Sequence, residues 1–200
     1  MNLEATLYDF QDGNGPVLAH QHPNGLGWVA DTATVDPSAY VGPNAWVYGN
    51  ARVYGNARVY GDASVCGNAR VLGNARVYGN ASVFGNASVF GGASVCGDAR
   101  VYRNASVFGN ASVYENASVY KDASVFGGAS VYGNARVYGN ARVYEDARVY
   151  GNASVCGVTK WSNVFGNARI HGTAIVKDKD VLGDTELDGS PMEVLRDLEI

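Results

Sequence analysis

The sequence predicts an all-β fold, a single-stranded parallel β-helix that forms a triangular prism of repeated coils. The first observation is a fixed period: every sixth residue from Val29 to Val155 is a valine, twenty-two in succession. The second is that each six-residue unit combines a strand pattern with a turn, as in Val53-Tyr54-Gly55-Asn56-Ala57-Arg58. A short fixed period indicates a solenoid, in which each repeat stacks on its neighbours and none folds alone.

The strand of each unit reads Ala, then Arg or Ser, then Val, then usually an aromatic residue. Side chains at alternate positions of a strand lie on the same face, which places Val and Ala inside the prism and the aromatic and polar residues outside. The Gly-Asn or Gly-Asp pair that follows predicts a corner, because glycine adopts positive φ without strain and Asn or Asp tolerates it. Three units then close one coil of about 18 residues.

One unit carries a family signature. Val41-Gly42-Pro43-Asn44-Ala45-Trp46 has an aliphatic residue, then glycine, and a small residue at the fifth place. This signature resembles that of the hexapeptide-repeat left-handed β-helix family, and the resemblance implies left-handed winding. It extends over residues 29–157 and, less regularly, over 164–189. The segments 12–20 and 27–30 also look like the start of hexapeptide-repeat proteins of bacteria and their phages, which implies no activity.

The period divides this single domain into three parts. They are an N-terminal cap at 1–28, a β-helix at 29–189 with an irregularity at 158–163, and a C-terminal capping helix at 190–200. Within the first cap, residues 3–7 alternate like a strand, and Asp12-Gly13-Asn14-Gly15 predicts a tight turn. Caps are expected because open ends of a solenoid leave strand edges unpaired.

The C-terminal part departs from the strict repeat. Residues 158–163 add three positions between Val155 and Val164, which predicts a bulge that adjusts the register or the wall of a pocket. Ser190-Pro191-Met192-Glu193 has the pattern of a helix start, with a capping box and proline at the first helical position. That helix would cover the open end of the core or dock on another subunit. The looser repeat before it predicts inward positions at Ile170, Ile175, Val181 and Leu187.

Composition favours a cytoplasmic protein. No stretch approaches the length of a membrane span, and the acidic start lacks the basic and apolar regions of a signal peptide. Cys66, Cys96 and Cys156 all occupy outward positions, too far apart along or around the shaft to form a disulfide within the chain. Free thiols suit a reducing compartment.

The net charge of −4 is unevenly distributed. Residues 41–157 carry ten basic and six acidic side chains, whereas both ends are acidic. Arg52 should stack on Arg70, and Arg58 on Arg76, in adjacent coils. Either a bound anion or cation–π contacts with neighbouring rings would stabilise these ladders. The basic excess is small for a protein that follows phosphates, so nucleic acid is not an expected partner.

Aromatic residues at outward positions form a column along each side of the prism. One column contains Tyr54, Phe90, Phe108, Phe126 and Tyr144, and serines at 88, 106 and 124 flank its phenylalanines. An uncharged aromatic patch of this kind usually marks an interface, and self-association is the preferred interpretation. The alternatives are a surface on which sugars or nucleobases stack, and ring stacking that only stabilises the shaft.

The resemblance also implies an enzyme alternative, since the family includes acyltransferases and γ-class carbonic anhydrases. Such enzymes place histidines, and often a projecting loop, between subunits. Here the regular repeats contain neither. His20 and His22 form a His-x-His pair that could bind zinc with a third ligand, and His171 could contribute only from another chain.

The preferred function is therefore a non-enzymatic scaffold or binding module that self-associates through an aromatic column and needs no cofactor. One alternative is an acyltransferase-like or metal-dependent enzyme with a site between subunits. The other is a phage or bacterial protein that binds a sugar, a nucleotide or a host protein on its aromatic faces. No membrane partner is expected.

Overall fold

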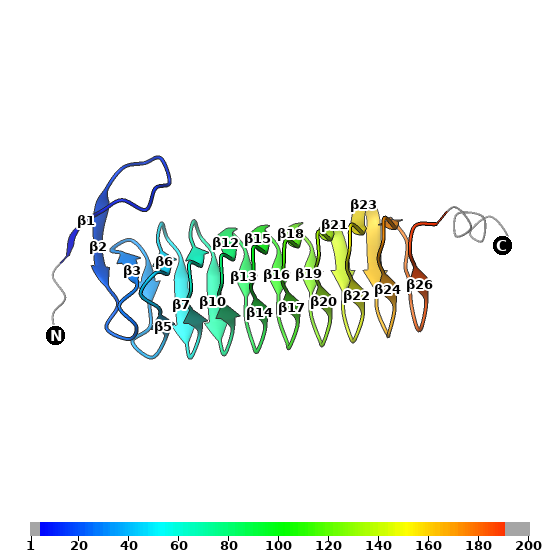
Figure 1. Ribbon diagram of the computed structural model, residues 1–200, viewed down its shortest axis with the longest axis horizontal. Helices are drawn as coiled ribbons and strands as arrows, with labels where there is room; N and C mark the ends of the chain where they lie inside the picture. The colour runs from blue at the N-terminus through cyan, green and yellow to red at the C-terminus, as the bar shows by residue number, and fades with distance from the viewer. Residues whose placement is uncertain (1–4, 191–200) are drawn as a thin grey trace.

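A computed structural model describes residues 5–190 and shows a parallel β-solenoid whose coils stack along one axis (Figure 1). Each coil contains three short strands, and the strands of successive coils pair in parallel to build three faces. The third face holds nine strands, one from each coil. Along the shaft the register advances by 18 residues, so that Val101 pairs with Val119 and Val83 with Val101. The predicted all-β solenoid and its coil length are confirmed.

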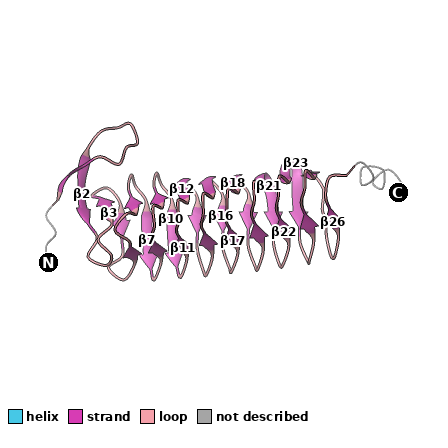
Figure 2. Ribbon diagram, viewed as in Figure 1, coloured by secondary structure: helices cyan, strands magenta, loops and turns pink. Residues whose placement is uncertain are grey.

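Strands of the same face are named in order along the shaft (Figure 2). The first face contains β3 (Trp28–Ala30), β6 (Trp46–Val47), β9 (Ser64–Val65), β12 (Ser82–Gly85), β15 (Arg100–Arg103), β18 (Ser118–Lys121), β21 (Arg136–Val143), β23 (Ser154–Val164) and β25 (Ile175–Lys177). The second contains β4 (Thr34–Val35), β7 (Arg52–Gly55), β10 (Arg70–Gly73), β13 (Ser88–Val89), β16 (Ser106–Val107) and β19 (Ser124–Val125). The third contains β5 (Tyr40–Val41), β8 (Arg58–Val59), β11 (Arg76–Val77), β14 (Ser94–Val95), β17 (Ser112–Val113), β20 (Ser130–Val131), β22 (Arg148–Val149), β24 (Arg169–Ile170) and β26 (Glu186–Leu187). The long strands β21 and β23 continue from the first face around a corner onto the second.

The core is a continuous column of valine and alanine inside the coils. From Val41 to Val155 every repeat valine, and every alanine of the same units, is fully buried. Small side chains fill this narrow interior without voids, and larger ones would force the strands apart. Because each coil contacts only its neighbours, the core extends by repetition and does not widen.

Corners follow the three faces, and the residue after the outward aromatic position has positive φ in most coils. Glycine occupies this place in most coils, for example Gly133 with φ of 70°. Five described corners carry a side chain there instead, with φ between 53° and 62°: Arg103, Glu115, Lys121, Glu145 and Asp178. The next residue is usually Asn or Asp, and these side chains form ladders that the sequence analysis did not anticipate. On the corner after the first face the donor–acceptor distance is 3.1 Å from Asn68 to Asn86, 3.1 Å from Asn86 to Asn104 and 3.0 Å from Asn104 to Asp122.

An antiparallel hairpin covers the first coil. β1 (Thr6–Tyr8) pairs with β2 (Val17–Gln21), and β2 pairs with β3, so the hairpin extends the first face beyond the repeats (Figure 1). The turn expected at 12–15 lies within a longer loop, residues 9–16, that runs along the outside of the first coils, and in it Asp12 Oδ1 accepts the backbone N–H of Asn14 at 3.0 Å (Figure 1). The rings explain this path, since Phe10 stacks on Tyr48 at 4.8 Å and Tyr8 on Trp28 at 4.1 Å between centroids.

The last coils correct one predicted inward position. Val176 is fully buried, whereas Ile175 is 68% exposed and points outward. The six-residue spacing after Ile170 is thus preserved at Val176, and the slip falls between Val176 and Val181. The capping helix predicted at 190–200 lies, apart from its first residue, outside the described residues. The part of the chain that is described contains no helix able to cross a membrane.

Candidate functional site

The aromatic columns are continuous ring stacks. On the second face, Phe90, Phe108 and Phe126 follow one another with centroids 4.7 and 4.8 Å apart and planes within 2°. Tyr144 and Phe165 continue this stack. Phe165 was not predicted as a member of the column, because the bulge shifts it out of the 18-residue period. Each ring covers the faces of its neighbours, so the three phenylalanines are half-buried and present only their edges.

On their own strands and on the corner that follows, the surface beside these phenylalanines carries no charge over three coils. Ser88, Ser106 and Ser124 lie before them on the strands, and two of the three corners that follow read Gly-Gly, at 91–92 and 127–128. We call this area the phenylalanine strip: Phe90, Phe108 and Phe126 with the serines before them, the corner residues 91–92, 109–110 and 127–128, and Ser94, Ser112 and Ser130 after the corner. Arginines occupy the corresponding strand positions at both ends of the strip, such as Arg70 and Arg142. Of the predicted residues, Phe90, Phe108 and Phe126 therefore lie together in this strip.

Tyr54 and Tyr144 have different environments from the strip that they border. Tyr54 has Leu72 as its neighbour in the next coil and is 37% exposed, whereas Tyr144 is half-buried between Phe126 and Phe165. Desolvation by these neighbours raises the pKa of the Tyr144 hydroxyl. Only Tyr144 is thus part of the continuous stack.

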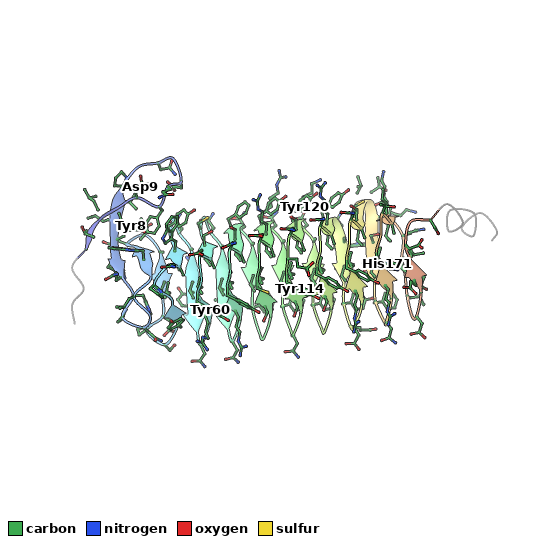
Figure 3. All side chains as sticks on the ribbon, viewed as in Figure 1. Tyr8, Asp9, Tyr60, Tyr114, Tyr120 and His171 are labelled. Atoms are coloured by element: carbon green, nitrogen blue, oxygen red, sulfur yellow. The ribbon has the colours of Figure 1, made fainter. Side chains whose placement is uncertain are left out.

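The other two columns carry hydroxyl groups and cysteines. Tyr102, Tyr120 and Tyr138 stack on the first face at 4.9 and 5.0 Å. Figure 3 shows Tyr60, Tyr114 and His171 along another side of the shaft from Tyr120. All three cysteines are free, and Cys156 is buried, because the strand that follows it bulges over the end of the column. A hydrogen bond with Cys156 raises the pKa of Tyr138 to about 12.

The arginine ladders are present as predicted. Arg52 pairs in register with Arg70, and Arg58 with Arg76. The guanidinium of Arg58 lies 5.1 Å from the ring centroid of Tyr40 and 5.5 Å from that of Tyr60. For Arg58 at least, the neighbouring rings supply the cation–π stabilisation that was one of the two interpretations. No other Arg–ring contact of this kind is found at these ladders within residues 5–190.

The three histidines are engaged in separate local contacts. His20 Nδ1 lies 2.8 Å from a carboxylate oxygen of Asp31, and His171 Nε2 lies 2.9 Å from one of Glu186. His22 is buried, and its ring nitrogen lies 3.2 Å from the carbonyl oxygen of Asn24. Nowhere in the described segment do three His, Cys, Asp or Glu side chains gather as metal ligands. The structure therefore brings together neither His20 and His22 with a third ligand nor either of them with His171.

The insertion near residue 158 is a bulge organised by one carboxylate. Oδ1 of Asp178 accepts the backbone N–H groups of Val158, Thr159 and Lys160 at 2.6, 3.0 and 3.2 Å. The hydroxyl of Thr159 donates to Oδ2 of Asp178 at 2.9 Å. The bulge projects Trp161, which is 51% exposed, and the guanidinium of Arg142 lies 3.9 Å from its ring centroid. The insertion signalled a bulge in the sequence, but nothing there identified Asp178 as its acceptor.

We expect the bulge to loosen in acid. The N–H group of Val158, followed by those of Lys160 and Thr159, lowers the pKa of Asp178 to about 2. Because the folded pKa lies below the unfolded value of 3.8, this stabilisation is present above that value and is lost as the pH falls through about 2. Trp161 fluorescence should change over that range, and Asp178→Ala should make trypsin cleave after Lys160 faster at neutral pH. Asp184→Ala is the control, since Asp184 accepts only a side-chain amide of Asn167. Equal cleavage rates for both variants would show that Asp178 does not hold the bulge.

Two stretches of the shaft match a known repeat family. The family is described as YdcK Beta solenoid repeat, and the matches cover residues 45–61, 51–67, 129–145 and 141–157. The chain carries β-solenoid repeats. The matched segments lie toward both ends of the regular shaft, and the strands between them continue the same register. No curated protein sequence matches the chain.

Proposed function

We propose that this chain is a non-enzymatic β-solenoid scaffold that self-associates through the phenylalanine strip. The observation that carries the proposal is the absence of charge from this strip over three described coils, whereas Arg70 and Arg76 lie on the strands of the coil before it and Arg142, Glu145 and Asp146 in the coil after it. Exposed charges keep surfaces apart from one another, so an uncharged aromatic area favours contact with another protein surface. The hexapeptide signature supports left-handed winding and a triangular cross-section for this scaffold.

The stacked rings favour a rigid contact. A ring held between two parallel neighbours has little rotamer freedom left to lose when a partner covers its edge, which lowers the entropic cost of association. The Gly-Gly corners at 91–92 and 127–128 present no side chains and would let a second copy approach closely. A two-fold pairing of strip against strip is the simplest closed arrangement, because the same area then serves both copies.

The alternatives have less support in the described residues. A stacking site for nucleobases or sugars needs free ring faces, whereas the phenylalanine rings already cover one another. An enzyme site between subunits would need His20, His22 or His171 to leave their present carboxylate or carbonyl partners. Free cysteines support a reducing compartment such as the cytoplasm, and a second copy is the expected partner.

Phe108→Lys should dissociate the oligomer, because it places a charge at the centre of the strip. Light scattering and native mass spectrometry would measure the solution mass of the parent and the variant. Tyr132→Lys is a matched control: Tyr132 also stacks between two rings, Tyr114 and Tyr150, but on the third face. The proposal predicts a monomer for Phe108→Lys and an oligomer for the control. A monomeric parent, or a Phe108→Lys variant of unchanged mass, would contradict it.

A further inference from the structure

A second surface lies on the corner that follows the first face, and we call it the basic corner. It consists of Arg103, Lys121, Arg142 and Lys160, with Arg100 and Arg136 beside it on the first face. Arg103 and Lys121 stand directly in register in adjacent coils. Arg142 and Lys160 follow on β21 and β23, the strands that turn from the first face onto the second. Arg103 and Lys121 are therefore about 4.8 Å apart, one coil from each other, and Lys160 in the bulge and Arg142 just past the corner extend the positive charge over the following coils.

Within residues 5–190, Arg103, Lys121 and Arg142 form no ion pair. In the described residues both ion pairs involve histidines, and no carboxylate lies within ion-pair distance of Arg103, Lys121 or Arg142. The carboxylates on the same corner accept hydrogen bonds elsewhere: Asp122 from the amide of Asn104, and Asp178 from the bulge. Lys121 Nζ lies 5.6 Å from the ring centroid of Tyr138, and Arg142 contacts Trp161, but neither contact supplies a negative charge. Like charges stacked in register repel one another, and a bound anion would offset that repulsion.

The backbone at this corner also distinguishes Arg103 and Lys121 from most other corner residues. Arg103 and Lys121 have φ of 61° and 62°, in the left-handed region that favours glycine. Glycine with positive φ occupies this corner position at 49, 67, 85 and 139, and Asp178 occupies it after β25 with φ of 53°. Two adjacent coils therefore accept backbone strain and charge repulsion together. Strain that persists in this way often coincides with a binding site.

Hydrogen-bond donors line the basic corner. Tyr102, Tyr120 and Tyr138 stack face to face, so their rings turn only edges and hydroxyl groups toward solvent. The ladder of asparagine amides, including Asn86 and Asn104, runs beside them. Arg142 covers one face of Trp161. The surface thus offers cations, hydroxyls and amides along the shaft, and few free ring faces.

We propose that the basic corner binds an acidic polysaccharide, a linear polymer with repeated carboxylates and many hydroxyl groups. A polymer fits because the cations repeat along the shaft, and one small anion would meet only one or two of them. Carboxylates would pair with Arg103, Lys121 and Arg142, and sugar hydroxyls with the tyrosine hydroxyls and asparagine amides. Single-stranded nucleic acid is the weaker fit, because its binding depends on bases stacking on exposed aromatic faces.

The test compares binding of polygalacturonate to the full chain and to two double variants by titration calorimetry at low salt. Arg103→Gly with Lys121→Gly removes two charges and installs the residue that most other coils use at this corner, so the fold is retained. Binding should weaken about tenfold, and the remaining affinity should depend less on salt. The matched control is Arg58→Ser with Arg76→Ser, which removes two charges from the third face and installs the serine that the repeat has elsewhere. The control should bind within about threefold of the parent.

Several results would overturn this inference. They are no binding of polygalacturonate by the parent, an equal loss in both double variants, or tighter binding of oligo(dT) than of polygalacturonate. Neutral dextran should not bind, and equal binding of dextran would also contradict the role of charge. The unfolding temperature of each variant would confirm that lost binding does not reflect a lost fold. The basic corner and the phenylalanine strip are separate, so either proposal can fail while the other stands.

Discussion

Val113→Asp should unfold the shaft or destabilise it by at least about 4 kcal/mol. Val113 is fully buried in β17 and pairs with Val95 and Val131, so its side chain contacts only the valine and alanine column. A carboxylate at that place would have no donor and no water. Because each coil contacts only its two neighbours, a defect in the coil of Val113 disturbs its packing against the coils on both sides at once.

Urea unfolding followed by circular dichroism would measure this effect. Ser112→Asp introduces the same side chain one residue earlier, on the outer surface of the same strand, and should cost less than about 1 kcal/mol. A Val113→Asp variant as stable as Ser112→Asp would contradict the inward assignment of the repeat valines. The pair thus tests the alternation on which the whole fold depends.

Gly133→Val should cost about 3 kcal/mol, because a β-branched residue is strained at positive φ and meets the next coil. Gly133 has φ of 70°, and a Cβ atom there would lie 2.8 Å from the backbone nitrogen of Gly151 and 2.9 Å from its carbonyl oxygen. The backbone N–H of Gly133 also donates to Oε2 of Glu115 at 2.8 Å, and a shift of the corner would weaken that bond.

Gly133→Asn separates the two causes. Asparagine carries the same Cβ atom as valine but tolerates the left-handed region. Gly133→Asn should therefore lower the free energy of unfolding by only about 1 kcal/mol. Thermal and urea unfolding of the two variants should give the order parent, Asn, Val. Equal stability of the Val and Asn variants would show that branching does not matter and that the corner adapts to either side chain.

The regular part of the fold was predictable because one strong signal repeats. Valine at every sixth residue specifies the inward positions, and the Gly-Asn pairs specify the corners, so the coil and its register follow from local chemistry alone. Ile175 shows where this reasoning fails. Ile175 and Val176 are both aliphatic, and only the strand pairing of Ser154 with Ile175 decides which of them faces inward.

The surface was harder to predict from the sequence. The phenylalanine column was evident from its 18-residue spacing, but its half-buried state depends on the parallel stacking of rings. The basic corner was missed because its members occupy different places in the repeat: Arg103 and Lys121 at the corner, Arg142 on a strand and Lys160 in the bulge. Only the turn of β21 and β23 from one face to the next brings Arg142 and Lys160 to the same side of the shaft as Arg103 and Lys121. Asp178 was missed for a similar reason, since its donors lie 18 to 20 residues, about one coil, earlier in the chain.

The interior of the solenoid is the same on all three faces, whereas each outer face is different. The loss of one six-residue unit, such as residues 110–115, would therefore leave every valine facing inward and still move all later surface residues onto the preceding face. Phe108 would then lie against Tyr132 in place of Phe126, and Arg103 against Gly127 in place of Lys121. The loss of three units would shorten the shaft by one coil and keep each later column on its own side. Insertion or deletion of whole six-residue units can thus change which surface residues lie on each face, while every intermediate sequence still folds.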